Sequence, residues 1–306
     1  MSAKILLLHV GLPKTGSTSL QKWCHDNRDL LKTGNVDYPA TAPSGPARKH
    51  QFVVSELRNG TFKQVEHIVH NADQSKKLLL STEGLTNHLY DFPEESLARF
   101  RTILDGWQVM AFMVVRDAAP WLKSYYKQLV LNPPRPEYGY ATELPLEEFG
   151  QLPRIQRLLD HASLSRDVQT KLGADSVTVQ RFEEDWFSGF MNWAGLHDFD
   201  GRCDTPGHEH ASCGDEVTEL VRLINGMGLP PHARSHCLST LATTLESSSH
   251  ARKTSLSHIA AFYSPMSDHQ AGKSVWEDVV TDLVRATAPG SSENRLARSM
   301  DRPETR

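Results

Sequence analysis

The chain has 306 residues, of which 39% are hydrophobic and 23% are charged, as is usual for a globular protein with a large core. Its net charge of −4 at pH 7 argues against a general nucleic-acid binder, because such proteins carry an excess of Lys and Arg. A membrane span needs ~18 consecutive apolar residues, and the sequence offers no such stretch. We therefore expect that the protein does not bind nucleic acid and has no membrane-spanning segment.

The first apolar run, Lys4–Val10, is predicted to be a strand, and a loop rich in glycine and hydroxyl groups follows it. A helical pattern begins directly after that loop, at Ser17. A strand, a glycine loop and a helix form a phosphate cradle, because loop N–H groups point inward and the helix N-terminus is partly positive. Lys14 adds a full positive charge there, whereas we interpret His9 as a buried, hydrogen-bonded histidine.

The position of Lys14 within this loop separates two classes of phosphate-binding protein. A Walker A loop reads GxxxxGK[ST], with the lysine directly after the second glycine. Gly11 and Gly16 have the required separation, but Ser17 follows Gly16, and the lysine comes two residues before it. An ATP- or GTP-hydrolysing loop is therefore a poor match, and an ordinary strand-to-helix turn that contains a lysine is the structural alternative.

The segment from Pro13 to Thr18, PKTGST, resembles the 5′-phosphosulfate loop of sulfotransferases that use 3′-phosphoadenylyl sulfate (PAPS). The resemblance is to the bacterial and carbohydrate-type enzymes and covers roughly residues 4 to 196. It implies a P-loop NTPase-like topology and a set of residues that bind the 5′-phosphate: Lys14, Thr15, Gly16, Ser17 and Thr18. Lys14 would also stabilise the leaving phosphate oxygen, where negative charge builds during transfer.

The second apolar run, Lys77–Thr82, is followed by Glu83 and, five residues later, by His88. A neutral acceptor must lose a proton during sulfuryl transfer, so a base is needed near the sulfur atom. We predict Glu83 as this base, with His88 as the second candidate. A carboxylate that caps a helix or forms a salt bridge is the alternative interpretation of Glu83.

The third apolar run, Val109–Val115, ends at Arg116, and a helical pattern over Pro120–Leu131 carries Ser124. In the sulfotransferases that the loop resembles, an arginine at this strand end and a serine on the next helix hold the 3′-phosphate of the nucleotide. The planar guanidinium suits that role because its donors match phosphate oxygens. A surface arginine is the structural alternative.

Two later segments are compared with the same family. The strand predicted over Ser176–Gln180 leads into an aromatic and acidic corner at Phe182, which we interpret as structural. The loop Asn132–Pro145 is either a solvated connection or a lip that binds the acceptor through its tyrosines. Related cytosolic enzymes carry a late Arg-Lys-Gly motif, but Arg252-Lys253 is followed here by threonine, so its role in nucleotide binding stays open.

Strands that alternate with helices predict an α/β fold with three layers, in which helices flank a mostly parallel central sheet. The four predicted strands are rich in Leu and Val, as in parallel strands that are buried on both faces. Helical patterns cover Ser17–Leu31, Phe62–Asn71, Glu94–Leu104, Pro120–Leu131, Leu146–Leu172 and Asp215–Met227. We expect one sulfotransferase domain over residues 1–285 and a flexible tail over 286–306.

The cysteines and histidines indicate no metal centre. Cys24 falls on the apolar face of the first helix and is predicted to lie in the core. A zinc site is conceivable from ligand type in the loop 201–214, but the spacing matches no zinc signature, and its candidate ligands are Cys203, His208, His210 and Cys213. Sulfuryl transfer requires no metal, so we predict none.

The sequence thus predicts a PAPS-dependent sulfotransferase with PAP, 3′,5′-bisphosphoadenosine, as its product. The acceptor is a hydroxyl or amine, and the resemblance favours a carbohydrate. Because the short N-terminal apolar run leads straight into the phosphate loop, we expect no signal peptide and a cytoplasmic location. Two alternatives stay open: a P-loop kinase or other nucleotide-dependent transferase that uses ATP–Mg²⁺, and a non-catalytic relative that keeps the loop.

Overall fold

The computed structural model describes residues 4–40, 48–72, 77–135, 138–196 and 214–247. The chain divides into two compact units, which are described separately: Met1–Leu122 with Gly150–Glu209, and Lys123–Phe149 with His210–Arg306. The single domain over 1–285 stays a prediction. The predicted tail 286–306 and the Arg252-Lys253 motif lie outside the described residues.

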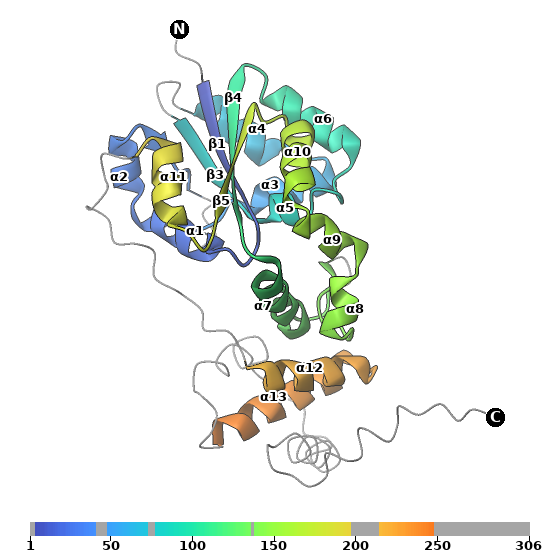
Figure 1. Cartoon of the computed structure of the whole chain (residues 1–306). Helices are drawn as coiled ribbons and strands as arrows, with labels where there is room; N and C mark the ends of the chain where they lie inside the picture. The colour runs from blue at the N-terminus through green and yellow to red at the C-terminus, as the bar shows by residue number, and fades with distance from the viewer. Residues whose placement is uncertain (1–3, 41–47, 73–76, 136–137, 197–213, 248–306) are drawn as a thin grey trace, which may run out of the picture. The chain divides into compact units, whose positions relative to one another are not determined.

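The described part of the first unit contains a parallel five-stranded sheet with the order β2-β3-β1-β4-β5 (Figure 1). Its strands are β1 Lys4–Gly11, β2 Val36–Asp37, β3 Lys77–Ser81, β4 Trp107–Val115 and β5 Ser176–Arg181. The chain crosses from β3 on one side of β1 to β4 on the other. The strand order therefore reverses beside β1, and such a switch point is where ligands bind in open α/β sheets.

The apolar runs form the sheet interior as predicted, except at one edge. In β1, every residue from Leu6 to Gly11 is buried, and β3 and the second half of β4 are buried as well. These strands lie between neighbours and under helices on both faces, which is why they contain few polar residues. The prediction that all four strands are buried was wrong for β5, because β5 is an edge strand and Val179 is 43% exposed.

Helices cover both faces of the sheet (Figure 1). On one face, Leu7, Leu79 and Phe112 of the strands pack in a core with helices α1 Ser17–Asp26, α2 Arg28–Thr33 and α11 Trp186–Ala194. The helices on the other side are α3 Gln51–Asn59, α4 Lys63–Asn71, α5 Gly84–Asn87, α6 Glu94–Ile103, α9 Pro153–Leu159 and α10 His161–Leu172. Cys24 of α1 is fully buried in the core that contains Leu7, Leu79 and Phe112, as predicted.

Some helix boundaries differ from the predicted ones. The helix expected over Ser17–Leu31 is two helices, because the chain leaves helical geometry at Asn27, whose amide Nδ2 donates to the Trp23 carbonyl at 2.9 Å. The segment expected over Leu146–Leu172 contains α8 Leu146–Gly150, α9 and α10. Here Asp160 begins α10 by accepting the Ser163 N–H, a preferred N-cap arrangement.

The described part of the second unit is helical. Helix α7, Ala118–Leu131, begins in the first unit and continues into the second, which also contains α8, α12 Asp215–Gly226 and α13 Pro231–Ser247. Asp215 at the start of α12 pairs with the Lys127 ammonium of α7 at 2.7 Å. Asn225 near the end of α12 donates to the Val130 carbonyl at 3.0 Å and so joins the two helices at a second point.

Candidate functional site

The predicted phosphate loop lies between β1 and α1, at the carboxyl end of the central strand. Gly16 is the N-cap of α1 with φ +81° and forms no side-chain cap hydrogen bond. The N-terminus of a helix carries partial positive charge and favours a nearby anion. Lys14 also has a positive φ, +66°, which is uncommon for a residue with a Cβ and is found often at ligand sites.

Both loop glycines are required by close contacts. A Cβ on Gly16 would lie 2.8 Å from Cζ2 of Trp186 and 3.2 Å from Cε2 of Phe182. A Cβ on Gly11, where φ is +107°, would lie 3.0 Å from Cα of Glu83. Gly11 therefore lets the segment after β3 approach the loop, and Gly16 lets an aromatic pair pack against it.

Three hydrogen bonds hold the loop in place, two to its surroundings and one within it. Leu12 N–H donates to the Val114 carbonyl of β4 at 2.9 Å, and the Trp121 indole N–H donates to the Pro13 carbonyl at 2.9 Å. The buried Thr15 hydroxyl donates to the Leu12 carbonyl at 2.6 Å. Thr15 therefore has its hydroxyl proton committed inside the loop, although its oxygen can still accept.

Lys14 and Arg116 bring two positive charges to the ends of neighbouring strands β1 and β4. Burial lowers the pKa of the Lys14 ammonium, and repulsion from the Arg116 guanidinium lowers it further, whereas attraction to Glu83 raises it. The three charged side chains are therefore close enough to interact. Two cations held together without an anion between them repel each other, and a bound anion would relieve that repulsion.

Arg116 contacts the corner that follows β5, at Phe182 and Glu183. Its guanidinium carbon lies 5.0 Å from the centroid of the Phe182 ring, and its Nε lies 3.8 Å from Oε1 of Glu183. That Nε is buried and has no hydrogen-bond partner among the described residues. The corner that we predicted to be structural thus orients a candidate anion-binding residue, and Phe182 stacks on Trp186 in the same place.

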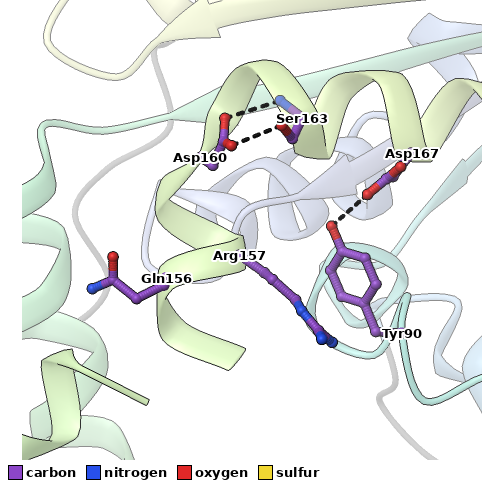
Figure 2. A pocket seen from close by; sticks show the side chains of 6 residues that line it. All are labelled: Tyr90, Gln156, Arg157, Asp160, Ser163 and Asp167. Carbon is purple, nitrogen blue, oxygen red and sulfur yellow. Dashed lines mark hydrogen bonds between the residues drawn. The ribbon is translucent and has the colours of Figure 1, made fainter. Parts of the chain in front are cut away.

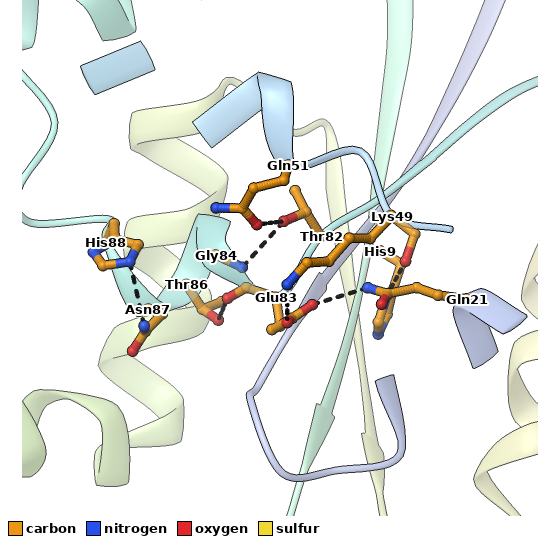
Figure 3. Close-up of polar contacts among 11 residues, drawn as sticks. His9, Gln21, Lys49, Gln51, Thr82, Glu83, Gly84, Thr86, Asn87 and His88 are labelled. Carbon is orange, nitrogen blue, oxygen red and sulfur yellow. Dashed lines mark hydrogen bonds and ion pairs between the residues drawn. The ribbon is translucent and has the colours of Figure 1, made fainter. Parts of the chain in front are cut away.

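Glu83 lies at the start of α5, and both of its carboxylate oxygens are occupied (Figure 3). Gln21 Nε2 donates to Oε2 at 2.9 Å, and Lys49 Nζ donates to Oε1 at 3.1 Å. Burial alone would raise the pKa of this carboxyl, but the Lys49 charge and the Gln21 hydrogen bond outweigh burial and lower the pKa. Glu83 is thus an ion-paired carboxylate beside the loop, which leaves its predicted role as base untested.

His9 is buried and hydrogen-bonded, as predicted. Its Nδ1 lies 2.7 Å from Oγ of Ser81 on β3, and its Nε2 has no hydrogen-bond partner among the described residues. Burial lowers the pKa of His9 to about 4, with a smaller opposing effect from Glu83. His9 is therefore neutral at pH 7.

His88 lies at the opposite end of α5 from Glu83. Its Nδ1 is 3.0 Å from Oδ2 of Asp91 and 3.0 Å from Nη2 of Arg154, and its Nε2 is 3.4 Å from the Asn87 amide nitrogen. Burial lowers its pKa, while the Asp91 hydrogen bond raises it. Both ring nitrogens thus have polar neighbours, as both Glu83 oxygens do, and the choice between Glu83 and His88 as base stays untested.

The remaining predicted ligands of the nucleotide are placed as follows. Ser17 is buried and Thr18 is exposed, both in the first turn of α1. Ser124 lies on α7 within the second unit, and the loop 132–145 belongs to that unit too. Their predicted contacts with the nucleotide and the acceptor stay predictions.

A cleft of about 480 Å³ lies elsewhere on the first unit (Figure 2). Its lining residues are Tyr90, Gln156, Arg157, Asp160, Ser163 and Asp167. The Tyr90 hydroxyl donates to Asp167 at 2.7 Å, and Asp160 is occupied by Ser163. None of the predicted site residues lines this cleft, and its carboxylates already have partners.

The described residues show neither a candidate metal centre nor a helix that could cross a membrane. That part of the chain holds no group of three or more His, Cys, Asp or Glu side chains suited to a metal. The candidate zinc ligands of the loop 201–214 lie outside the described residues. No described helix has both the length and the apolar character needed to cross a bilayer.

Comparison of the chain with family models, curated proteins and solved structures gave no match. The candidate site therefore rests on its own geometry. Sequence reasoning missed four of its residues, namely Gln21, Lys49, Trp121 and Trp186. Each acts through a contact with a residue far away in the chain, and no local pattern marks such a contact.

Proposed function

We propose that this protein is a sulfotransferase that moves the sulfuryl group of PAPS to a hydroxyl or amine of an acceptor, with a carbohydrate favoured. The observation that carries the proposal is geometric: a glycine loop with Lys14 joins the end of β1 to the N-terminus of α1, and Arg116 directly follows the neighbouring strand β4. The buried Nε of Arg116, which has no hydrogen-bond partner among the described residues, adds a donor at the end of β4. A nucleotide with phosphates at both the 5′ and 3′ positions suits two cations on neighbouring strand ends.

In this proposal, the loop residues Lys14–Thr18 hold the 5′-phosphate, and Arg116 holds the 3′-phosphate together with Ser124. The sheet would then have the P-loop NTPase-like topology that the loop sequence implies. Neither a metal ion nor a membrane anchor is part of the proposal, and the reaction would take place in the cytoplasm.

The proposed reaction breaks the bond between sulfur and the bridging phosphate oxygen of PAPS and forms a bond from sulfur to the acceptor oxygen. The electron pair of the broken bond stays on the phosphate, where Lys14 would stabilise the developing charge. The acceptor proton moves to Glu83, the proposed base, and the products are PAP and the sulfated acceptor. Lys14 and Glu83 interact electrostatically, which supports their assignment to one reaction centre.

The deciding experiment measures calorimetric binding of PAP, 5′-AMP and ATP–Mg²⁺ to the wild type, Arg116→Ala and Arg99→Ala. Arg99 is an exposed control that pairs with Glu66 at 2.7 Å on the surface. The wild type and the control should prefer PAP to 5′-AMP, and Arg116→Ala should lose most of that preference. A charge-assisted hydrogen bond is worth ~1.5–3 kcal/mol, so the expected loss in PAP affinity is about tenfold to hundredfold.

Two outcomes would contradict the proposed sulfotransferase activity, and a third would contradict only the role of Arg116. Binding of ATP–Mg²⁺ without binding of PAP would favour a kinase or another nucleotide-dependent transferase. PAP binding without any transfer of ³⁵S from PAPS to a panel of glycosides, phenols and amines would favour a non-catalytic relative. An unchanged preference for PAP in Arg116→Ala would remove Arg116 from the nucleotide site.

A further inference from the structure

The Glu83 carboxylate is clamped by two side chains that come from different elements. Gln21 reaches Oε2 from α1, and Lys49 reaches Oε1 from the segment that precedes α3 (Figure 3). A carboxylate on an unrestrained side chain rotates about its terminal bonds. Two donors from separate elements therefore fix both the plane of this carboxylate and its position beside Gly11.

The two donors differ in exposure and charge. Gln21 is neutral and only 4% exposed, whereas the charged Lys49 side chain is 42% exposed. Exposed ion pairs contribute little to folding, because holding a long lysine side chain costs entropy and water screens the charges. The contribution of Lys49 is therefore expected mainly through the ionisation of Glu83, and a shift of one unit in the Glu83 pKa corresponds to only ~1.4 kcal/mol of stability at neutral pH.

Four charged or titratable side chains from different elements of the described structure interact with Glu83. Lys49 comes from the segment before α3, Lys14 from the phosphate loop, His9 from β1 and Tyr38 from the end of β2. Burial lowers the pKa of His9 to about 4 and raises that of Tyr38, so both are neutral at pH 7. Lys49 exerts the largest effect that opposes the cost of burying the Glu83 charge.

We propose that Lys49 is a positioning residue for the catalytic base: with Gln21, it holds the Glu83 carboxylate ionised and oriented toward the phosphate loop. This inference rests on the proposed function, in which Glu83 accepts the acceptor proton. Lys49 touches neither the donor nor the acceptor in this assignment. Its effect reaches the reaction only through the charge state and the orientation of Glu83.

The direct test is a titration of Glu83 by NMR of protein labelled with ¹³C at glutamate Cδ, with the signal assigned by its loss in Glu83→Gln. An opposite charge within ~4–6 Å typically lowers a carboxyl pKa by ~1–3 units. Lys49→Gln should therefore raise the Glu83 midpoint by about one pH unit or more, and Lys49→Arg should restore it. Lys22→Gln removes an exposed lysine that pairs with Asp26 and should leave Glu83 unchanged. An unchanged midpoint in Lys49→Gln would overturn the inference.

The second test is the pH profile of ³⁵S transfer from PAPS to a glycoside acceptor. The acid limb of kcat/KM reports the pKa of the base in the free enzyme. Lys49→Gln should move that limb to higher pH by about one unit or more. The loss should be confined to acid pH, with little change near pH 8 and unaltered PAP affinity. A loss that is equal at every pH, or that Lys49→Arg does not restore, would show a merely structural role and overturn the inference.

The two measurements separate failure of this inference from failure of the proposed function. If the wild type neither binds PAP nor transfers sulfate, the proposed function fails, and with it the catalytic meaning of the clamp. The NMR titration would still decide whether Lys49 controls the ionisation of Glu83. If transfer occurs but the Glu83 midpoint does not respond to Lys49, only the inference about Lys49 fails.

Discussion

Replacement of Gly16 by alanine tests the packing of the phosphate loop most directly. The new Cβ would stand 2.8 Å from Cζ2 of Trp186 and 3.2 Å from Cε2 of Phe182, both of which belong to the ring pair stacked behind the loop. The backbone at Gly16 has φ +81°, a conformation that costs a residue with a Cβ ~1–2 kcal/mol. Overpacking at a crowded site adds ~1–3 kcal/mol, so Gly16→Ala should lower the free energy of unfolding by roughly 2–5 kcal/mol.

Gly106 is the matched control because it shares the backbone cost without the crowding. Its φ is +78°, and a Cβ placed there meets no atom within 4 Å. Gly106→Ala should therefore lose only the backbone share, ~1–2 kcal/mol. Urea unfolding followed by circular dichroism gives both values, provided that the slope with urea concentration is equal in the two variants. Equal destabilisation of the two variants would refute the packing of Trp186 against the loop.

The other predictions concern charge and proton transfer. Lys14→Ala should lower kcat by about 10²–10³-fold with the urea midpoint little changed. The exposed control Lys22→Ala should keep wild-type turnover. Wild-type turnover in Lys14→Ala would contradict the role of Lys14 in stabilising the leaving phosphate. Glu83→Gln should lower kcat by about 10²–10⁴-fold at unchanged PAP affinity, and normal turnover there together with a loss in His88→Gln would move the base to His88. The third prediction is that stability falls as pH drops from 6.5 to 4, because unfolded His9 binds a proton near 6.5 and folded His9 only at about 4. At ~1.4 kcal/mol per pH unit the His9 share of this loss is about 3 kcal/mol. Burial also lowers the pKa of His50 to about 4, so His9→Gln should reduce the loss between pH 7 and pH 4 by the His9 share without abolishing it. Equal losses in the two proteins, measured by urea titration, would show that His9 is not responsible.

The strands that could be predicted are those whose burial leaves a mark on the sequence. β1, β3 and β4 lie inside the sheet, so both faces of each strand must be apolar, and their apolar runs locate them within one or two residues. β2 has only two residues, Val36 and Asp37, and is too short to leave a pattern. In β5, the sequence SVTVQR has strand character, but its polar positions already match the exposed edge that the structure shows.

The polar contacts of the candidate site were beyond sequence reasoning for a different physical reason. Lys49 and Glu83 are 34 residues apart, and Lys49 follows a segment without helical or strand periodicity. Trp121 and Trp186 occupy helix positions that could equally serve an ordinary core. What turns them toward the loop is the strand order, which places β4 beside β1 and β5 beside β4. The order of strands is a property of the folded sheet that local pattern does not encode.

The electrostatics of the loop support the proposal that an anionic ligand binds at this edge of the sheet. A protein selected only for folding gains nothing from Lys14 beside Arg116, because repulsion between like charges opposes their burial. The nearest carboxylates do not remove that repulsion fully, since Glu83 is engaged by Lys49 and Glu183 stays 3.8 Å from the Arg116 Nε. Gly16, the N-cap of α1, has no side chain that could accept an N–H group of that helix. One ligand with several phosphate oxygens would satisfy the two cations and the helix together, which is why the proposed donor is a nucleotide with two phosphorylated positions.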